Sequence, residues 1–433
     1  MHDIDPQTFC VQPYLELRIN SDGSLNFCHA ARKQNFGKID NIHHTQLDNY
    51  FNSSPTIINV RQQIQTGQQT TQCENCYKNE SQGIISFRQR HNLRYNIFPG
   101  LDFSQSAQES NVWKHIKQKK LKPKFYHISF GNLCNMACLM CCADNSSLFA
   151  SLGKKIGLVA KQQPIKLDWT VEPAWSEFCN HIVTNEQIIC LHVMGGEPMY
   201  HKRFRELLEF LVQQKHTNFH FTFVTNGSIY NQELIALLGQ FKSVTIEISI
   251  ETVDASNDYI RRHGNTSQVL ANIKQWCNHI CDTFNVVLRT VPQALSAPHY
   301  INLLYFARDH HLLIDSNVLQ YPSFLKVNVL PEYLRTNIKK RLQQEFLSTE
   351  YTNSAHAINL RNQNNLDTNL QKNAQDLIVM LDEPCVDIEQ ERQLFVDHCV
   401  KFDRIGQQNI KDYIYDLWAF MQNYGYEKKL FDH

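Results

Sequence analysis

The sequence has no excess of charge of either sign, because 42 lysine and arginine residues balance 42 aspartate and glutamate residues. This balance gives no evidence for nucleic acid or an anionic membrane as a partner. A long apolar run is also missing, since no stretch approaches the roughly 18 uncharged apolar residues that would span a bilayer. The first residues lack the basic start and apolar segment of a secretory signal. We therefore expect a cytoplasmic protein without a membrane partner.

Cysteine, by contrast, is abundant, with 14 residues in a chain of 433. Thiols stay reduced in the cytoplasm, so these residues are better interpreted as metal ligands, catalytic groups or core residues than as disulfides. The length suits two or three domains, and a hydrophobic content of 42% supports a large core.

Composition and pattern divide the chain into four regions. Residues 1–98 look short-stranded, and "YLELRINSDGSLNFC" alternates apolar and polar residues around Asp22-Gly23, which predicts a hairpin. Residues 99–124 are predicted to be a polar connector, residues 125–330 to alternate strands with helices, and residues 331–433 to be mainly helical.

The third region predicts an α/β fold built from parallel strand–helix units. Its six strand-like segments are residues 125–130, 188–194, 220–225, 243–250, 285–291 and 313–320. Six units would form a partial (β/α)6 TIM-like barrel or an open sheet, and in either case ligands gather at the carboxyl ends of the strands. The cysteine-rich segment 131–147, Gly195-Gly196 and Asn226-Gly227 all follow strands, so we expect them to converge.

The segment "GNLCNMACLMCC" contains C-x3-C-x2-C, formed by Cys134, Cys138 and Cys141. A structural zinc site usually takes four ligands in two paired halves. Three thiolates in one loop can instead hold three irons of a four-iron cluster and leave the fourth iron open to a small ligand. Zinc ligands and plain core thiols remain the alternatives.

This pattern resembles the radical S-adenosylmethionine (SAM) superfamily. C-x3-C-x2-C follows the first barrel strand in that superfamily, although Met140 stands where an aromatic residue is usual. "GGEP" (195–198), "TNG" (225–227) and "SIE" (249–251) then follow the second, third and fourth strands in the family's order. The resemblance implies a SAM-binding 4Fe-4S cluster on the three cysteines.

The resemblance also implies SAM contacts. Gly195 and Gly196 would let the backbone approach the methionine moiety, and Glu197 would accept a hydrogen bond from its ammonium. The remaining candidates are Pro198, which completes the same motif, and four residues in or directly after strands: Asn226, Ser249, Glu251 and Arg289. Ser249 and Glu251 would reach the ribose, while Arg289 would meet the SAM carboxylate. As alternatives, Gly195-Gly196 would be an ordinary strand-to-helix turn, and Ser249 and Glu251 would be polar residues at a strand end. Arg289 would be a surface arginine.

Four further cysteines lie near the N-terminus: Cys10, Cys28, Cys73 and Cys76. A zinc knuckle or unrelated thiols would explain them. Their spacing, with Gly23 between the first two, resembles the SPASM and twitch auxiliary-cluster domains, here placed before the barrel. In the group with that order, C-x2-C is followed by residues matching Glu80, Gly83, Ser86 and Arg88, and the chain closes on a segment like "KFDRIGQQNIKDYI" (401–414). Four thiolates imply one closed auxiliary 4Fe-4S cluster.

Together these resemblances imply an enzyme that cleaves SAM reductively to a 5′-deoxyadenosyl radical, which abstracts a hydrogen atom from a substrate. A peptide or protein is the expected substrate, with flavodoxin or ferredoxin as the electron donor. A carbohydrate or small metabolite is the alternative substrate, and a non-catalytic metal or iron–sulfur scaffold is the alternative from another class.

Overall fold

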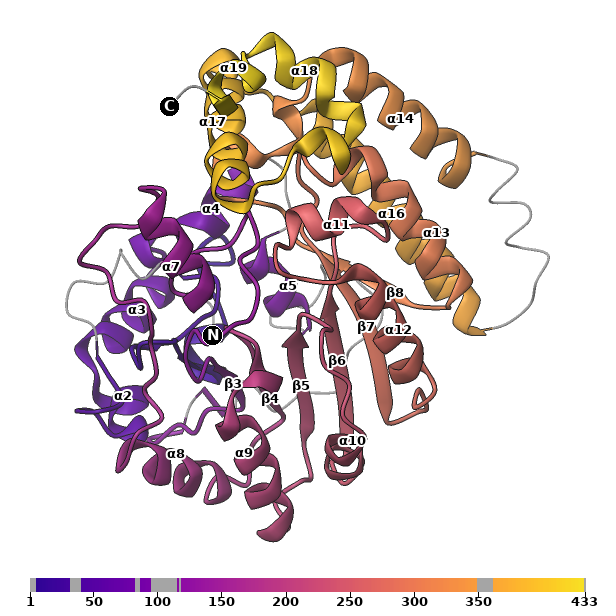
Figure 1. The fold of residues 1–433 in the computed structure, drawn as a ribbon. Coiled ribbons are helices and arrows are strands. Elements are labelled where there is room, and N and C mark those ends of the chain that lie inside the picture. The colour runs from indigo at the N-terminus through magenta and orange to yellow at the C-terminus, as the bar shows by residue number, and fades with distance from the viewer. Residues whose placement is uncertain are drawn as a thin grey trace. The chain divides into compact units, whose positions relative to one another are not determined.

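A computed structural model describes residues 5–31, 40–81, 86–94, 115–116, 118–348 and 361–431. The chain divides into two compact units. Unit 1 comprises residues 1–133, 166–223 and 233–243, and unit 2 comprises residues 134–165, 224–232 and 244–433. Figure 1 labels the elements of both. The predicted Gly83 and most of the predicted connector lie outside the described residues, and the four-region division stays a prediction.

Unit 1 is built on strands in the order β2-β1-β3-β4-β5. Their bounds are β1 (Glu16–Ile19), β2 (Leu25–Asn26), β3 (Phe125–Ile128), β4 (Cys190–Val193) and β5 (His220–Thr225), of which β5 belongs to this unit through residue 223. The predicted hairpin is confirmed: β1 and β2 pair antiparallel, and Gly23 takes a φ of +78° at the turn. The parallel pairing of β1 with β3 extends the sheet beyond the predicted strands.

The helices of unit 1 are α1 (Gln12–Leu15), α2 (Leu47–Ser53), α3 (Pro55–Gln65), α4 (Glu74–Ser81), α5 (Phe87–Arg94), α8 (Ala174–Val183), α9 (Lys202–Gln213) and α10 (Gln232–Leu238). Two 3-10 turns, η2 (Thr71–Cys73) and η3 (Pro198–Tyr200), carry predicted site residues. Helix α9 shows why the helical pattern formed: Phe204, Leu207, Leu208 and Leu211 fall at helical spacing and are all buried.

Unit 2 contains the parallel strands β6 (Ser243–Ser249), β7 (Phe284–Thr290) and β8 (Leu313–Ser316). Their register pairs Ser249 with Arg289 and Arg289 with Asp315. The helices are α7 (Ser147–Lys155), α11 (Ala255–Ile260), α12 (Thr266–Cys277), α13 (Tyr300–Asp309), α14 (Glu332–Phe346), α16 (Arg361–Asp382), α17 (Ile388–Gly406), α18 (Trp418–Asn423) and α19 (Tyr426–Phe431). The unit also contains the 3-10 turns η4 (Ala297–His299), η5 (Ser323–Leu325), η6 (Val327–Val329), η7 (Ile410–Asp412) and η8 (Tyr415–Leu417).

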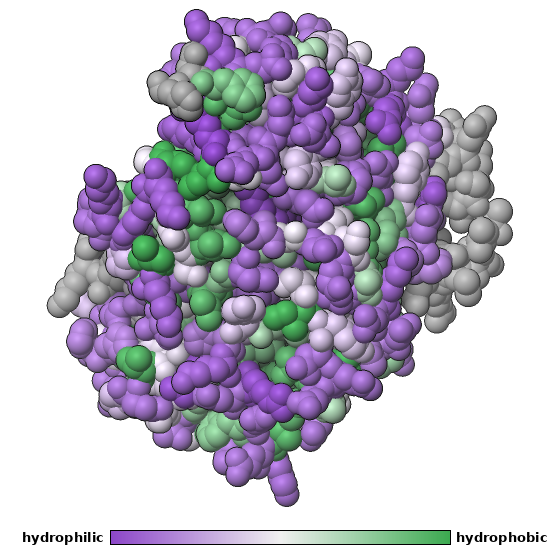
Figure 2. Space-filling model, viewed as in Figure 1, coloured by the Kyte–Doolittle hydropathy of each residue, from purple (hydrophilic) through white to green (hydrophobic). Residues whose placement is uncertain are grey.

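The architecture confirms the predicted α/β fold class. All six predicted strands are present as β3 to β8, parallel where their pairing within a unit is described, with helices between them. The sheet is not closed, as a partial barrel requires, and the end of the chain is helical. Polar residues dominate the face shown in Figure 2, with smaller apolar areas between them. Within the described part of the chain, every helix is too short or too polar to cross a bilayer.

Candidate iron–sulfur sites

The four N-terminal cysteines meet in unit 1. Cys10 precedes α1, Cys28 follows β2, Cys73 ends η2 and Cys76 lies in α4. All four line one cavity together with Phe27, Phe87, Arg88 and His91. Burial raises the pKa of each thiol, to about 12 for Cys73, and neighbouring cysteines raise the pKa of Cys10 further.

Arg88 fixes the walls of this cavity. Its guanidinium donates to both carboxylate oxygens of Glu80, at 3.0 and 2.5 Å, and to the backbone oxygen of Phe9 at 2.9 Å. The Ser86 hydroxyl also donates to Glu80. The residues singled out after C-x2-C therefore tie α4 and α5 to the segment that carries Cys10.

The spacing of the sulfur atoms separates the metal alternatives. A tetrahedral zinc with Zn–S bonds of about 2.3 Å places its sulfurs roughly 3.8 Å apart. Among the described residues, the only group of three potential ligand atoms within 4.8 Å of one another is Glu16, Cys28 and His29, so neither cysteine set forms such a triple. A four-iron cluster holds its cysteines further apart, because the irons lie between them. Among the described residues, the cysteine sets therefore do not show the close spacing that a single zinc ion requires.

Glu16, His29 and His127 were not predicted from the sequence. Glu16 is fully buried, and its carboxylate accepts hydrogen bonds from the His29 backbone N–H at 2.6 Å and from the Gln12 amide at 2.7 Å. His127 Nε2 lies 3.8 Å from Glu16 Oε1, and the His29 and His127 rings stack at 4.8 Å. A charged residue inside the "YLELRI" strand was the available signal, because alternation would place it on an exposed face.

The barrel cysteines lie in unit 2, in a loop between Cys134 and α7. The Ala137 N–H donates to the Arg262 carbonyl at 3.0 Å, and the Leu139 N–H donates to the Ile260 carbonyl at 2.9 Å. The loop is thus paired, strand-like, with the segment that follows α11. Cys138 is buried, Cys134 and Cys141 are partly exposed, and the neighbouring Cys142 is exposed.

Arg261 is the main residue of this site that sequence reasoning missed. Burial raises the pKa of the Cys138 thiol, and the Arg261 charge opposes that rise. Cys138 and Cys134 in turn help to hold Arg261 protonated. The pair "RR" (261–262) after a helix was a weak signal, because charged pairs are common on surfaces, whereas both arginines are buried here.

Two of the predicted SAM contacts of unit 2, Glu251 and Asn226, are connected to this loop by hydrogen bonds, Glu251 through Arg261. Glu251 is buried and accepts from Thr290 Oγ1 at 3.0 Å, the Val291 N–H at 2.9 Å and Arg261 at 3.2 Å. Burial raises the pKa of Glu251 against the opposing effect of Arg261. The Glu251 carboxylate thus binds the Arg261 guanidinium, which interacts electrostatically with Cys138 and Cys134.

The other three predicted contacts of unit 2 differ in their surroundings. The Asn226 amide donates to Asn135 Oδ1 at 2.7 Å, which joins "TNG" to the cysteine loop. Ser249 is half-buried at the end of β6. Arg289 forms an ion pair with Glu247, and within unit 2 it is a strand residue at the sheet rather than a contact of the cysteine loop.

The "GGEP" residues lie in unit 1, where the glycines are required by close packing. Gly195 and Gly196 have φ of +81° and +61°, and a Cβ at Gly196 would come within 2.6 Å of the Leu133 carbonyl. The Glu197 N–H donates to that same carbonyl at 2.8 Å, and the Glu197 carboxylate accepts from the Met199 N–H at 3.1 Å. Pro198 is buried at the start of η3. The motif therefore packs on the residue immediately before Cys134.

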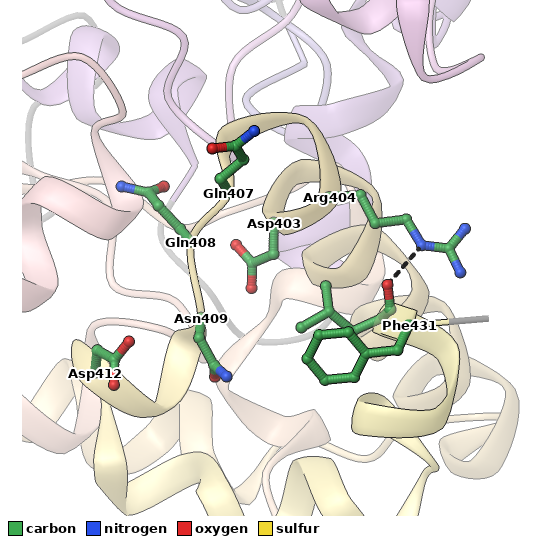
Figure 3. Close-up of a pocket in the computed structure, with 8 residues that line it drawn as sticks. Asp403, Arg404, Gln407, Gln408, Asn409, Asp412 and Phe431 are labelled. Atoms are coloured by element: carbon green, nitrogen blue, oxygen red, sulfur yellow. Dashed lines mark hydrogen bonds between the residues drawn. The ribbon is translucent and has the colours of Figure 1, made fainter. Parts of the chain in front are cut away.

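A pocket in unit 2 lies at the end of α17 and contains no cysteine (Figure 3). Its inner wall includes Asp403, which accepts from Tyr259 and Tyr426 hydroxyls at 3.0 and 2.5 Å and pairs with Arg262. Burial raises the pKa of Asp403 to about 6. Since Arg262 accepts from the cysteine loop through its carbonyl, this cluster supports that loop. His398 of α17 also donates to the Leu139 carbonyl at 3.0 Å.

Comparison with known proteins gives two family matches. Residues 128–291 match the radical SAM superfamily, and residues 10–77 match the SPASM iron–sulfur cluster-binding domain. No curated protein matches the chain.

Among solved structures, anSMEcpe with bound AdoMet is similar at 12% identity and a TM-score of 0.39, over 52% of this chain and 61% of that one. The chain therefore spans less than two thirds of that protein. Streptococcus suis SuiB bound to precursor peptide SuiA is similar at 15% identity and a TM-score of 0.37, over 77% of this chain and 69% of that one. The two family matches agree with the predicted order: residues 128–291 match the radical SAM superfamily, and the match to the SPASM iron–sulfur cluster-binding domain lies before them.

Proposed function

We propose that this protein is a radical SAM enzyme that modifies a peptide or protein. The observation that carries the proposal is the loop of Cys134, Cys138 and Cys141, paired by its backbone to the residues around Arg261. When bound there, a four-iron cluster supplies one electron that cleaves SAM to methionine and a 5′-deoxyadenosyl radical, the species that abstracts hydrogen from the substrate.

The residues of the chain have separate roles in this proposal. The three thiolates hold the metal and leave one position for SAM, while Arg261 compensates part of the thiolate charge and Glu251 orients Arg261. Gly195, Gly196, Glu197 and Pro198 are kept as SAM contacts, together with Asn226, Ser249, Glu251 and Arg289. Cys138 and Glu251 are buried, so their side of the loop is shielded from water, which favours radical chemistry over side reactions with water.

The N-terminal cysteines would hold one auxiliary cluster. With four thiolates it has no open iron, so electron transfer or support of the substrate site suits it better than substrate ligation. The peptide substrate is supported by the SPASM match and by the similarity to SuiB, which was solved with a precursor peptide.

The test begins with anaerobic reconstitution and measurement of iron, sulfide and zinc, followed by assay of 5′-deoxyadenosine release from SAM. We expect about eight irons per chain and SAM cleavage that Cys138→Ala abolishes. Cys142→Ala is the matched control, because this exposed thiol adjoins Cys141 and should leave both iron and cleavage intact. Stoichiometric zinc without iron, or cleavage that survives Cys138→Ala, would overturn the proposal.

The substrate class needs a second assay. Deuterium should pass into 5′-deoxyadenosine from a deuterated peptide pool and not from deuterated carbohydrates. The reverse result would assign the enzyme to carbohydrate chemistry.

A further inference from the structure

Strand β1 brings the N-terminal hairpin to the edge of the sheet where ligands gather. It pairs in parallel with β3, so that Ile19 lies opposite Ile128, and Ile128 in turn lies opposite Val193 of β4. The residues that follow these three strands therefore lie next to one another at the carboxyl ends of the strands. The hairpin belongs to the predicted N-terminal domain, yet its first strand is also a parallel strand of this sheet.

Two buried serine hydroxyls lie beside Gly195 at this edge. Ser21 is in the turn after β1 and Ser129 directly follows β3, and the two residues are 4% and 2% exposed. Ser129 Oγ lies 2.5 Å, and Ser21 Oγ 3.5 Å, from the position that a Cβ at Gly195 would occupy. Both hydroxyls thus adjoin the first glycine of the motif that is proposed to contact the methionine end of SAM.

Main-chain hydrogen bonds hold the two serines in position. The Ser129 N–H donates to the Ile19 carbonyl at 2.9 Å, and the Ser129 carbonyl accepts from Trp169 Nε1 at 2.6 Å. The Gly23 N–H closes the hairpin turn by donating to the Asn20 carbonyl at 2.8 Å. The placement of both hydroxyls therefore depends on the sheet and the hairpin, and not on the N-terminal cysteines.

Neither hydroxyl takes part in holding the fold together. Within the part of the chain that the structure describes, Ser21 Oγ and Ser129 Oγ have no hydrogen-bond partner. A buried hydroxyl without a partner is destabilising, so two such groups side by side at the ligand-binding edge of a sheet indicate a bound polar group.

We propose that Ser21 and Ser129 donate hydrogen bonds to the carboxylate of SAM. This inference rests on the proposed function, and it extends the SAM site to a hairpin outside residues 128–291. An ionised carboxylate only accepts hydrogen bonds, so it suits hydroxyl donors, whereas the ammonium of SAM is assigned to Glu197. The two serines would add to Arg289, whose guanidinium already forms an ion pair.

The N-terminal domain would then contribute to SAM binding independently of its cysteines. Ser21→Ala should weaken SAM binding and keep the iron, whereas Cys76→Ala should lose iron and largely keep SAM binding. The two changes separate the two roles of the same domain.

The test measures the Kd of radiolabelled SAM by anaerobic equilibrium dialysis against the reconstituted full-length protein. Ser21→Ala and Ser129→Ala should each raise the Kd about tenfold with iron content unchanged, because each removes a hydrogen bond to a charged group. Ser54→Ala is the matched control. It removes a similarly buried hydroxyl of unit 1, one that donates to Asp40, and should leave the Kd unchanged.

A competition experiment locates the contact on SAM. S-adenosylhomocysteine keeps the amino-acid end of SAM, and 5′-methylthioadenosine lacks it. Against radiolabelled SAM, each serine substitution should weaken S-adenosylhomocysteine by the same factor of about ten and leave 5′-methylthioadenosine unaffected.

The other outcomes each contradict a defined part of the proposal. An unchanged Kd in both serine variants, or an equal rise in Ser54→Ala, overturns the role of the serines and leaves the proposed function in place. Equal weakening of the two competitors also overturns it, because the hydroxyls would then not contact the amino-acid end. Iron lost from both serine variants makes Ser21 and Ser129 structural residues and overturns the binding role. Absence of SAM binding in the parent protein refutes the proposed function itself.

Discussion

The two cysteine sites of this protein differ in the buried charged residue that acts most strongly on one of their thiols. In unit 1 the ionisable group that acts most strongly on Cys28 is the buried anion Glu16, whereas in unit 2 the group that acts most strongly on Cys138 is the buried cation Arg261. Both sites use thiols whose pKa burial raises, so the ligands alone do not distinguish them. Each site also holds a buried group of the other sign, Arg18 near Cys28 and Glu251 near Cys138, so the contrast concerns the strongest neighbour of one thiol and not the net charge of the site.

The two cysteine sites also differ in the number of thiols that each provides. In the proposed function, four thiols in unit 1 would close a cluster, while three in unit 2 would leave one iron for a small molecule. An open site that binds the positively charged SAM must also accept an electron, and a nearby cation makes that easier. A closed site has no substrate to bind and is free to carry a negative neighbour.

Loss of one N-terminal ligand should give the largest effect and tests whether the two sites are independent. Cys76→Ala should remove roughly half of the iron, because a four-iron cluster with one thiolate missing is lost or unstable. SAM binding, measured by isothermal calorimetry, should change little. Loss of all the iron would show that the two sites depend on each other and would remove the basis of the comparison.

The support of the barrel loop should have the next largest effect. Asp403→Ala leaves Arg262 buried without its partner, and breaking a buried ion pair costs about 3–5 kcal/mol. Urea unfolding of the anaerobic protein measures this loss. Asp382→Ala, which removes the exposed partner of Lys339, is the control and should cost at most about 1 kcal/mol. Equal effects of the two changes would remove the supporting role of Asp403.

The charge contrast itself is tested by Arg261→Gln. Removing the cation should make reduction of the barrel cluster harder, because a nearby positive charge favours the added electron. A tenfold change in a one-electron equilibrium corresponds to about 59 mV, and we expect a shift of that order. The titration is made in a Cys76→Ala background, with Arg308→Gln as an exposed control on α13. A positive shift, or none, would contradict the contrast.

Local pattern was sufficient to predict the strands, the hairpin and the two cysteine sets. The strands β3 to β8 are apolar runs that end at turn residues, and Gly23 marks a turn that only a flexible residue takes easily. Cysteine spacing together with the resemblance to two families predicted the two sets; the four N-terminal cysteines line one cavity, and their role as ligands stays a prediction. Side-chain roles at the SAM site remain predictions, since no bound ligand shows which residues contact it.

The buried charged residues beside the two sites could not be predicted, because their burial depends on distant pairings. Alternation would expose Glu16, but the pairing of β1 with β3 brings His127 beside its carboxylate, and Gln12 and His29 cover the rest. The β3 pairing joins residues more than a hundred positions apart. Arg261 likewise becomes a site residue only because the cysteine loop pairs with the end of α11.

The smallest expected effect concerns α11, which leads into Arg261. Asp254 caps this helix through Ser256, and its carboxylate pairs with His299 Nδ1 at 2.8 Å. The hydrogen bond with Asp254 is the main cause that raises the pKa of His299. The protonated ring is favoured in the folded state, so its contribution is complete below the unfolded pKa of about 6.5 and is lost as pH rises through the higher folded pKa. His299→Gln should therefore flatten the decline of stability above about pH 6.5, by less than about 1 kcal/mol because both groups are partly exposed. Thermal unfolding between pH 6 and 8 measures this, and a variant that declines as steeply as the parent would show that the pair does not control α11.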